Sequence, residues 1–251
     1  MQIVGYESGR PREPAALHLA ADGEVQKERL VRGRELSFAL DERHCAGRKV
    51  DSTHESCATE TAPYCEVHTT RWPCAHCRGQ CAMPIETCHE EHAIYLAAFE
   101  PDRYKVGVTR SWRLETRLTE QGARRAAHIR TVENGRTARQ IEAEIATDVP
   151  DRLTQAAKIE GLGRSLDVDA WEEFLEPFGV IETFAFDYGL DLDRQPIPTT
   201  MAIGRIRGSR GRILVLERGE TTYAVDLKAL VGYEITDGGS DRDRQASLGA
   251  F

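Results

Sequence analysis

The sequence contains no apolar run of the roughly 20 residues that a membrane-spanning helix needs. It does not open with the charged start and apolar core of a signal peptide. Lysine is scarce, with 5 lysines against 28 arginines, and acids exceed bases, so the 251 residues carry a net charge of −8. We therefore expect an acidic, cytoplasmic protein without a membrane partner. A chain of this length can bury one good core or two smaller ones.

Nucleotide-binding glycine patterns are also missing. The sequence has neither a P-loop nor a dinucleotide-binding fingerprint, both of which place backbone N–H groups against phosphates. No Ser-His-Asp arrangement can be argued from its spacing. These absences give no support to nucleotide-dependent enzymes or serine hydrolases of those kinds.

Cysteine is confined to one stretch, because all seven cysteines lie between Cys45 and Cys88. This stretch has few large apolar residues, so burial alone cannot hold it together. Thiols stay reduced in the cytosol, and thiols clustered together with histidines are typical of zinc sites. The segment from Cys45 to His92 therefore predicts structural zinc.

Two tetrahedral sites would account for these ligands. Pairs separated by two residues, such as Cys65 with His68, can bind one metal ion from a tight turn. The first predicted site comprises Cys45, Cys57, Cys65 and His68. The second comprises Cys74, Cys77, Cys88 and either Cys81 or His92. The alternative is a single zinc ion with several bystander cysteines. Four protein ligands leave no position for water, so we expect one or two structural ions.

A second segment is unusually basic. From Arg103 to Arg139 there are ten basic residues and three acids, a net charge of +7, whereas the rest of the chain carries −15. A basic island in an acidic protein is typical of a surface that binds phosphate. The alternative is a set of merely solvated arginines on helix faces. The candidate nucleic-acid-binding residues are Arg110, Arg113, Arg124, Arg125 and Arg130, and the expected partner is DNA or RNA.

Residue patterns around this island predict a compact α+β unit. In order, they indicate a hairpin of Ala93–Phe99 and Tyr104–Thr109, a helix from Trp112 to Glu120, a strand over about Ala127–Val132, and a helix over about Thr137–Ala146. Gly107 interrupts the second strand, which often marks the close approach of another group. Ser111 is the expected N-cap of the first helix, and Gly122 ends it.

The flanking segments are simpler. Short apolar runs at both ends of the chain predict small β modules, which either pack together or flank the core. Between the core and the C-terminal module, we expect a helix from Asp151 to Glu160, a second helix capped by Asp167 or Asp169, and a strand over Val180–Tyr188. The predicted domains are 1–44 (β module), 45–92 (zinc segment), 93–190 (core), 191–236 (β module) and 237–251 (disordered tail).

The order of motifs resembles an uncharacterised prokaryotic domain-of-unknown-function family. Its members carry a cysteine-rich segment ending in an ETCH-like motif, then a YLA…KVG(I/V)TR…R…QGA core and a glycine-rich β segment. The matching residues here are Glu86–His89, Tyr95–Ala97, Lys105–Arg110 and Gln121–Ala123. The similarity extends from Cys45 to Tyr233, and the resemblance implies no settled function.

The core also resembles, more remotely, the GIY-YIG nuclease superfamily. In that fold a hairpin carries a GIY and a YIG tripeptide. Ala93-Ile94-Tyr95 stands at the GIY position and keeps the tyrosine, whereas Lys105-Val106-Gly107 keeps only the glycine of YIG. The resemblance implies an α+β fold. It consists of a small GIY-YIG-like α/β core preceded by a zinc-ribbon-like segment and flanked by small β-sheet or barrel modules at both ends.

The same resemblance implies a site. Arg117 (or Arg113) matches an arginine on the helix after the hairpin, and Glu142 (or Glu144) matches a metal-binding glutamate on a later helix. The tyrosine or a water held by it would activate the nucleophile, the arginine would stabilise phosphorane charge, and Mg or Mn would neutralise the leaving oxygen. The lost tyrosine of YIG is replaced by a lysine that could grip phosphate. The candidate catalytic residues are Tyr95, Lys105, Arg117 and Glu142.

Three functions therefore stand as hypotheses. The first is a zinc-stabilised nucleic-acid-binding protein whose core does not catalyse. The second is a divalent-metal-dependent DNA or RNA phosphodiesterase, that is, an endonuclease. The third is a protein-interaction adaptor. Binding needs only a basic face, whereas catalysis also needs the tyrosine, arginine and glutamate to converge. The sequence does not set the oligomeric state.

Overall fold

The computed structural model describes residues 1–69 and 88–238. The chain divides into two compact units, and each is considered by itself. Unit 1 comprises Met1–Thr70, Tyr188–Leu190 and Pro196–Phe251, and unit 2 comprises Arg71–Asp187 and Asp191–Gln195. Both units contain strands and helices, so the predicted α+β class is confirmed at that level. Within the described part of the chain, no helix is long and apolar enough to span a bilayer.

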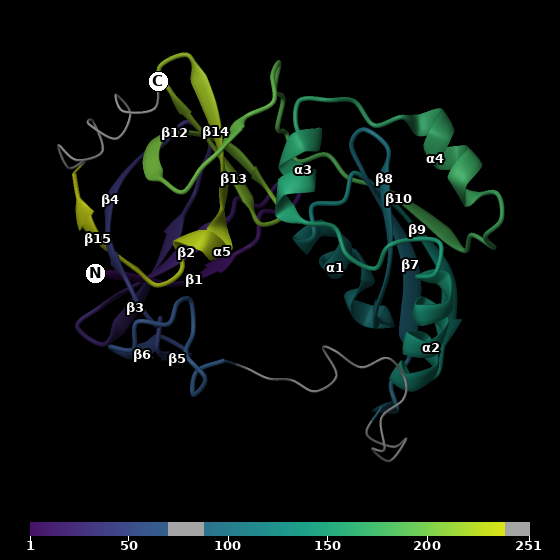
Figure 1. Ribbon diagram of the computed structural model, residues 1–251, viewed down its shortest axis with the longest axis horizontal. Helices are drawn as coiled ribbons and strands as arrows, with labels where there is room; N and C mark the ends of the chain where they lie inside the picture. Colours follow the sequence, from purple (N-terminus) through teal and green to yellow (C-terminus); the bar gives the residue numbers. More distant parts are fainter. Residues whose placement is uncertain (70–87, 239–251) are drawn as a thin grey trace. The chain divides into compact units, whose positions relative to one another are not determined.

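Unit 1 is built on an 11-stranded sheet (Figure 1). From the N-terminal part come β1 (Gln2–Glu7), β2 (Ala16–Ala21), β3 (Glu24–Arg29), β4 (Glu35–Arg43), β5 (Arg48–Val50) and β6 (Thr53–Glu55). From the C-terminal part come β11 (Ile197–Pro198), β12 (Ala202–Arg210), β13 (Ile213–Arg218), β14 (Thr221–Asp226), α5 (Leu227–Leu230) and β15 (Tyr233–Asp237). The order across the sheet is β11-β14-β13-β12-β4-β15-β1-β2-β3-β6-β5. The two terminal β segments therefore share one sheet, which is the first of the two arrangements that the sequence left open.

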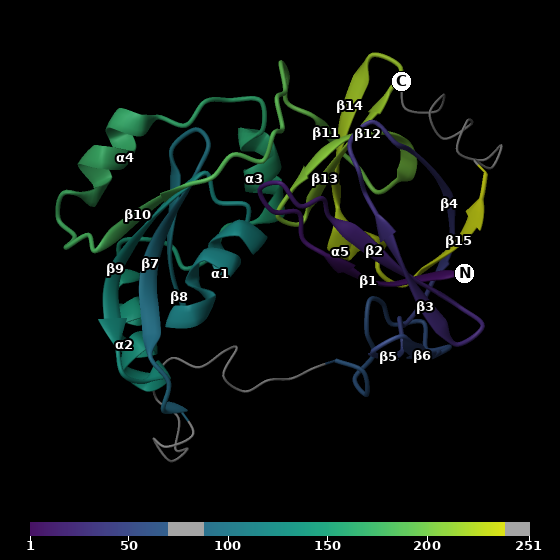
Figure 2. The ribbon, with the colours of Figure 1, turned by 180° about the vertical axis from the view of Figure 1, so that it is seen from behind.

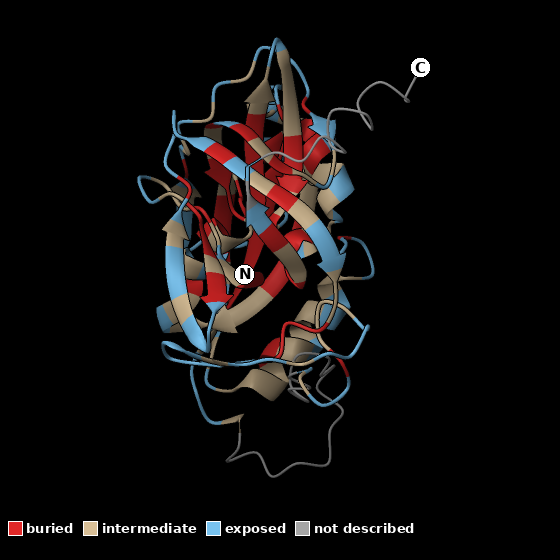
Figure 3. Cartoon of the chain, turned by 90° about the vertical axis from the view of Figure 1, so that its left-hand side faces the viewer, coloured by how far each residue is buried: buried red, intermediate tan, exposed pale blue. Residues whose placement is uncertain are grey.

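The strands of unit 1 pack around a large apolar core. Ile3 and Leu17 from the N-terminal strands belong to the same buried cluster as Leu214 and Leu216 from β13. Side chains alternate between the two faces of a strand, so short alternating runs are enough to supply this core. Figure 3 shows buried positions in red along these strands. Burial of apolar surface from both chain ends is what holds unit 1 together.

Unit 2 contains a four-stranded antiparallel sheet of β7 (His92–Phe99), β8 (Arg103–Arg110), β9 (Arg125–Val132) and β10 (Glu182–Ala185), in the order β10-β9-β7-β8. The predicted hairpin is confirmed, with β7 and β8 paired along their length. Strand β7 lies between β8 and β9, and all but one of its residues are buried. It is the central strand of the unit.

The helices of unit 2 are η3 (Ser111–Arg113), α1 (Leu114–Glu120), α2 (Gly135–Ile145), α3 (Gln155–Gly161) and α4 (Val168–Leu175). In Figure 1 and Figure 2, α1 and α2 lie on opposite sides of the sheet. Asn134 caps α2 by accepting from Thr137 N at 2.9 Å. Asp167 caps α4 by accepting from Ala170 N at 3.0 Å, which confirms the first of the two predicted caps.

Two predicted helix starts are wrong. Ser111 does not cap a helix, because a 3-10 turn begins there and α1 starts three residues later without a side-chain cap. The helix expected to begin at Asp151 begins at Gln155 instead. There the Thr154 side chain accepts from Ala157 N at 3.2 Å, which supplies the cap. A side-chain cap of the expected kind therefore exists for α3, at Thr154, whereas no side chain caps α1.

The aromatic residues of unit 2 form its core on one face of the sheet. Tyr104 stacks on Phe174 with ring centroids 4.4 Å apart, and Trp171 lies 5.3 Å from Tyr104. They pack with Ile94 and Leu96 of β7 in one cluster. Residue 104 therefore faces away from residues 105 and 107 on the same strand, as strand alternation requires.

The segment predicted to bind zinc is divided between the two units at residues 70 and 71. Residues 45–69 belong to unit 1, whereas Cys88 and His92 belong to unit 2. The predicted disorder of residues 239–251 lies outside the described residues.

Candidate metal centre and candidate nucleic-acid interface

Four residues of unit 1 bring their ligand atoms within 4.8 Å of one another, namely Cys45, Cys57, Cys65 and His68. Backbone hydrogen bonds position them. Cys45 N donates to Thr59 O at 2.8 Å, so the chain after β6 runs back beside the end of β4. Cys65 and His68 share a turn in which His68 N donates to Cys65 O at 3.1 Å. The structure thus brings together the whole of the first predicted ligand set.

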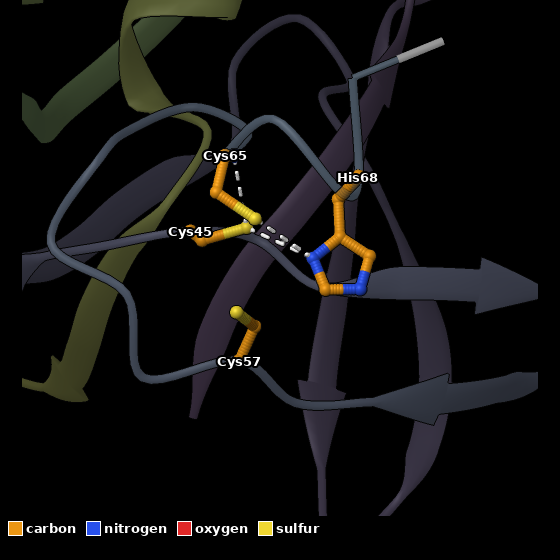
Figure 4. Close-up of side chains that lie close together, drawn as sticks. All are labelled: Cys45, Cys57, Cys65 and His68. Carbon is orange, nitrogen blue, oxygen red and sulfur yellow. Dashed lines mark hydrogen bonds between the residues drawn. The ribbon is translucent and has the colours of Figure 1, made fainter.

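The side chains of this cluster point toward one centre (Figure 4). Nδ1 of His68 lies 3.3 Å from Sγ of Cys45 and 3.3 Å from Sγ of Cys65. In a tetrahedral site, metal–sulfur bonds of about 2.3 Å and metal–nitrogen bonds of about 2.0 Å place ligand atoms roughly 3.5–3.8 Å apart. The observed spacing therefore fits one four-coordinate ion. Three sulfurs and an imidazole suit a soft or borderline metal.

The electrostatic surroundings favour thiolates in this cluster. The backbone N–H of His68 lowers the pKa of Cys65 to about 6. A hydrogen bond from the Thr59 side chain lowers the pKa of Cys57. Burial raises the pKa of Cys45, which is fully buried. Thiolates rather than thiols bind metal ions, so two of the three sulfurs are predisposed to be ligands.

The second predicted metal set stays a prediction. Cys74, Cys77 and Cys81 lie outside the described residues. Cys88 and His92 are described, and within the described residues neither belongs to a metal-ligand cluster. Nδ1 of His92 lies 2.6 Å from Glu90 O, and its ring packs against the backbone of Gly135.

In unit 2, Tyr95 lies directly across the hairpin from Gly107. A Cβ atom at position 107 would lie 2.5 Å from the tyrosine hydroxyl and 2.6 Å from Cζ. The glycine therefore makes room for the tyrosine ring. Tyr95 is 1% exposed, and its hydroxyl accepts a hydrogen bond from Gln121 Nε2 at 2.5 Å. Burial raises the pKa of Tyr95, against the opposing charge of Arg117, so the phenol is neutral at ordinary pH.

Lys105 is a buried cation on the same face of β8 as Gly107. It is 8% exposed. Burial, with the Arg117 guanidinium acting in the same direction, lowers the pKa of Lys105 to about 8. Glu142 and Asp151 oppose the shift, and Arg139 adds to it. The lysine therefore lies within electrostatic reach of two guanidiniums and two carboxylates.

Glu142 and Arg139 form an ion pair on one face of α2. Arg139 Nη1 donates to Glu142 Oε2 at 2.6 Å, and the glutamate side chain is only 12% exposed. The charge of Glu142 also acts on both Tyr95 and Lys105. The charges of Arg117 and Glu142 thus both act on Tyr95 and Lys105, and we call these four predicted residues, together with Gln121 and Arg139, the Lys105 cluster.

Sequence reasoning missed Gln121 and Arg139 as members of this cluster. Gln121 belongs to the QGA motif, but its role depends on the tertiary approach of α1 to β7. Arg139 was counted in the basic window without its pairing. A spacing of three residues on a helix, as between Arg139 and Glu142, was the available signal.

Much of the positive charge of the basic window is neutralised by acids. Arg103 pairs with Glu160 at 2.9 Å, and Arg110 pairs with Glu90. The further pairs are Arg113 and Arg117 with Glu120, and Arg124 with Glu100 and Asp187. Most of these acids lie outside the window in sequence and fold back onto it. The net charge of the window therefore overstates the charge of the surface.

Two of the predicted binding residues are not neutralised in this way. Arg125 and Arg130, both on β9, form no ion pair with any residue that the structure describes. Near the start of α1, Trp112 is 72% exposed, and the Arg113 guanidinium lies 5.8 Å from its ring centroid. The sequence predicted Trp112 only as a helix start. A tryptophan inside a basic stretch was the signal that could have marked it as a surface residue.

The fold and these two clusters define a two-unit α+β protein with a candidate cysteine–histidine metal centre and a buried polar cluster in its second unit. The chain belongs to the family described as "Protein of unknown function (DUF2797)", which it matches over residues 33–235. This confirms the predicted membership of a domain-of-unknown-function family. No curated protein and no solved structure shows significant similarity to the chain.

Proposed function

We propose that unit 2 binds DNA or RNA and holds a backbone phosphate at the Lys105 cluster. The observation that carries this proposal is a lysine that is buried beside the Arg117 guanidinium. Burying Lys105 beside Arg117 opposes its protonation, which is why its pKa falls to about 8. Such an arrangement reduces stability unless an anion compensates it, and perturbed groups of this kind cluster at functional sites. A phosphodiester supplies that anion.

An exposed aromatic residue of unit 2 supports the same proposal. Trp112 offers an exposed aromatic face. Arg125 and Arg130 pair across from Ala98 and Ile94 and so lie on the other face of the sheet from Lys105. Aromatic side chains stack on unpaired bases, and each stacked base contributes roughly 1–3 kcal/mol. The combination of guanidiniums with an exposed tryptophan favours single-stranded segments over duplex. The arginines set the salt dependence of binding, because each phosphate contact releases counterions.

For unit 1 we propose a structural zinc ion at Cys45, Cys57, Cys65 and His68. The ligand spacing and the donor set support zinc. All four ligand positions are occupied by protein, so the ion would stabilise the fold and leave no position for substrate. A zinc-dependent fold would keep unit 1 intact, while unit 2 carries the binding function.

Binding is tested by fluorescence anisotropy with labelled single-stranded DNA, single-stranded RNA and duplex DNA. We expect Lys105→Met to weaken affinity at least tenfold. The matched control is Arg152→Gln, which removes one positive charge from a side chain that is 79% exposed, and it should change affinity less than twofold. If the two variants weakened binding equally, binding would be nonspecific charge attraction and the proposed site would be wrong. Absence of binding at low salt would leave the adaptor hypothesis standing.

A second candidate function is divalent-metal-dependent phosphodiester cleavage. It is favoured by the common location of Tyr95, Arg117 and Glu142, and by the order hairpin, helix, strand, helix in β7, β8, α1, β9 and α2. Glu142 would hold Mg or Mn, and the cation would have to displace the Arg139 guanidinium. The ion would stabilise charge on the leaving oxygen. Tyr95 would position groups, because its raised pKa excludes a phenolate, whereas Lys105 has a pKa suited to proton transfer.

Cleavage is tested with the same oligonucleotides in the presence of Mg or Mn. Glu142→Gln should lower the cleavage rate by orders of magnitude while binding survives. Glu144→Gln is the matched control, since this residue lies two positions along the same helix and is exposed. Cleavage unchanged in Glu142→Gln would exclude the phosphodiesterase and leave the binding function alone.

A further inference from the structure

A pocket in unit 1 is lined by four arginines. Its volume is about 230 Å³. The arginines are Arg10, Arg12, Arg32 and Arg207, and among the described residues that line the pocket Glu13 is the single acid. The formal charges of the four arginines and of Glu13 sum to +3. This concentration of guanidiniums belongs to neither the metal centre nor the Lys105 cluster, and it lies outside the basic window of the sequence.

The walls of the pocket are fixed by backbone hydrogen bonds. The loop between β1 and β2 closes on itself, with Arg10 N donating to Glu13 O at 2.9 Å and Glu13 N donating to Arg10 O at 3.0 Å. Ala15 N donates to Ser209 Oγ at 3.0 Å, which ties the end of this loop to β12. Arg12 has a φ of 65°, an unfavourable conformation for a residue with a side chain. These hydrogen bonds therefore fix the backbone of the loop that carries Arg10 and Arg12.

A further part of the lining comes from residues 30–32 and from Tyr188 and Gly189. Arg32 Nη1 donates to Gly189 O at 3.0 Å, so this arginine fastens the short segment to the pocket. The Arg210 guanidinium lies over the Tyr188 ring, 5.5 Å from its centroid. Arg207 is paired with Glu217 at 3.2 Å, which offsets part of its charge. Arg10 and Arg12 are the arginines of the pocket loop, and the rim is open to solvent at Arg12 and Arg32.

We propose that this pocket binds a small anion that carries a diphosphate group. A pocket of about 230 Å³ has room for about eight water-sized groups at about 30 Å³ each. Inorganic diphosphate has about that size, and its charge at neutral pH matches the positive lining, since each phosphate carries about −1.5 to −2. Guanidiniums bind phosphate oxygens in bidentate fashion. Duplex DNA or RNA is too wide for such a pocket.

The proposal is tested by isothermal titration calorimetry of the full chain with inorganic diphosphate, ADP, inorganic phosphate and adenosine. We expect one site that binds diphosphate and ADP and prefers both over phosphate at least fivefold, with no binding of adenosine. Arg10→Gln and Arg12→Gln should each weaken diphosphate binding at least tenfold. Arg12→Gln alone suffices if Arg10→Gln disturbs the loop, because Arg12 is exposed.

Two control variants distinguish anion binding in this pocket from anion binding elsewhere on the chain. Arg152→Gln lowers the net charge by the same amount at an exposed position of unit 2, and Lys105→Met disables the Lys105 cluster. Both should bind diphosphate as the unaltered protein does. Loss of binding in Lys105→Met but not in Arg12→Gln would place the anion in unit 2 and overturn the proposal. Equal loss in Arg152→Gln, or no binding at millimolar diphosphate, would also overturn it.

Discussion

The metal centre of unit 1 and the Lys105 cluster of unit 2 concentrate chemical groups in opposite ways. The metal centre draws on residues 45–68, and its ligands converge through turns and short backbone contacts. The Lys105 cluster draws on β7, β8, α1 and α2, and it converges only because the sheet is formed. The first cluster can be predicted from residues that are close in sequence. The second cannot, because it depends on contacts that exist only in the tertiary structure.

The two clusters also differ in what they contribute to stability. A zinc ion bound by three thiolates and an imidazole would add folding free energy to a segment with few apolar residues. A buried lysine next to guanidiniums subtracts stability from an otherwise apolar sheet. One cluster is therefore expected to hold its fold together, whereas the other is held in place by the fold around it.

Metal removal should have the largest effect, and it should be confined to unit 1. Chelation or Cys65→Ser should lower the melting temperature of unit 1 by roughly 10 °C or more, because the binding energy of a structural ion is folding energy. Trp112 and Trp171 are described residues of unit 2, whereas Trp72 lies outside the described residues. In a Trp72→Phe background, circular dichroism should therefore show the transition while tryptophan fluorescence stays constant. Metal content is measured by elemental analysis, with one to two equivalents of zinc expected, and metal-free protein of unchanged stability would contradict a structural role for the ion.

Gly107→Ala should destabilise unit 2 by about 1–3 kcal/mol. The added Cβ would lie 2.5 Å from the Tyr95 hydroxyl, so the ring or the strand has to move. Gly179→Ala is the matched control, because no atom lies within 4 Å of its added Cβ. The stability of both variants is measured by urea unfolding, monitored through tryptophan fluorescence. If Gly107→Ala left the free energy of unfolding unchanged, Tyr95 would not be held against β8.

Lys105→Met should raise the stability of unit 2 by roughly 1–3 kcal/mol at pH 7. In the unfolded chain the lysine keeps its proton up to a pKa of 10.5, but in the folded protein only up to a pKa of about 8. Between these values the unfolded state binds more protons, so stability of the unaltered protein should rise with pH from about 8 to 10.5. The rise should vanish in Lys105→Met. A destabilised variant without this change in pH dependence would identify Lys105 as a packing residue.

The smallest expected effect concerns the paired arginines. Glu120 binds both Arg113 and Arg117, whose side chains are about half exposed. Glu120→Gln should leave stability within about 0.5 kcal/mol, as for exposed ion pairs. It should strengthen nucleic-acid binding about two- to fivefold, because two guanidiniums are released toward phosphate. Anisotropy titrations at two salt concentrations test this, and weaker binding would mean that Glu120 orients the arginines.

Local patterns in the sequence predicted the four strands of unit 2, its helices α1 to α4 and the first ligand set. Strong signals such as the apolar alternation of β7 and β8, or two ligands separated by two residues, depend on neighbours in sequence. The pairing of strands from both chain ends was left open, because it depends on contacts far apart in the chain. The starts of α1 and α3 were misplaced for a related reason, since a 3-10 turn and Thr154 compete with the signals at Ser111 and Asp151.

The charge of the basic window was the most misleading sequence signal. Glu160 and Asp187 neutralise arginines that lie more than fifty residues away in sequence. A count of charges within a sequence window cannot include partners that lie outside the window. Conversely, the arginine pocket of unit 1 was not predicted, because its residues come from separate parts of the chain, such as Arg10, Arg32 and Arg207.

The location of bound nucleic acid is the decisive measurement for the role of unit 2. Hydrogen–deuterium exchange should be measured with and without a saturating single-stranded oligonucleotide that lacks terminal phosphates, so that the arginine pocket is not engaged. We predict slower exchange in residues 103–120 and 125–145, with residues 1–69 unchanged. Protection confined to residues 1–69, or none anywhere despite measurable binding, would contradict the assignment of nucleic-acid binding to the Lys105 cluster.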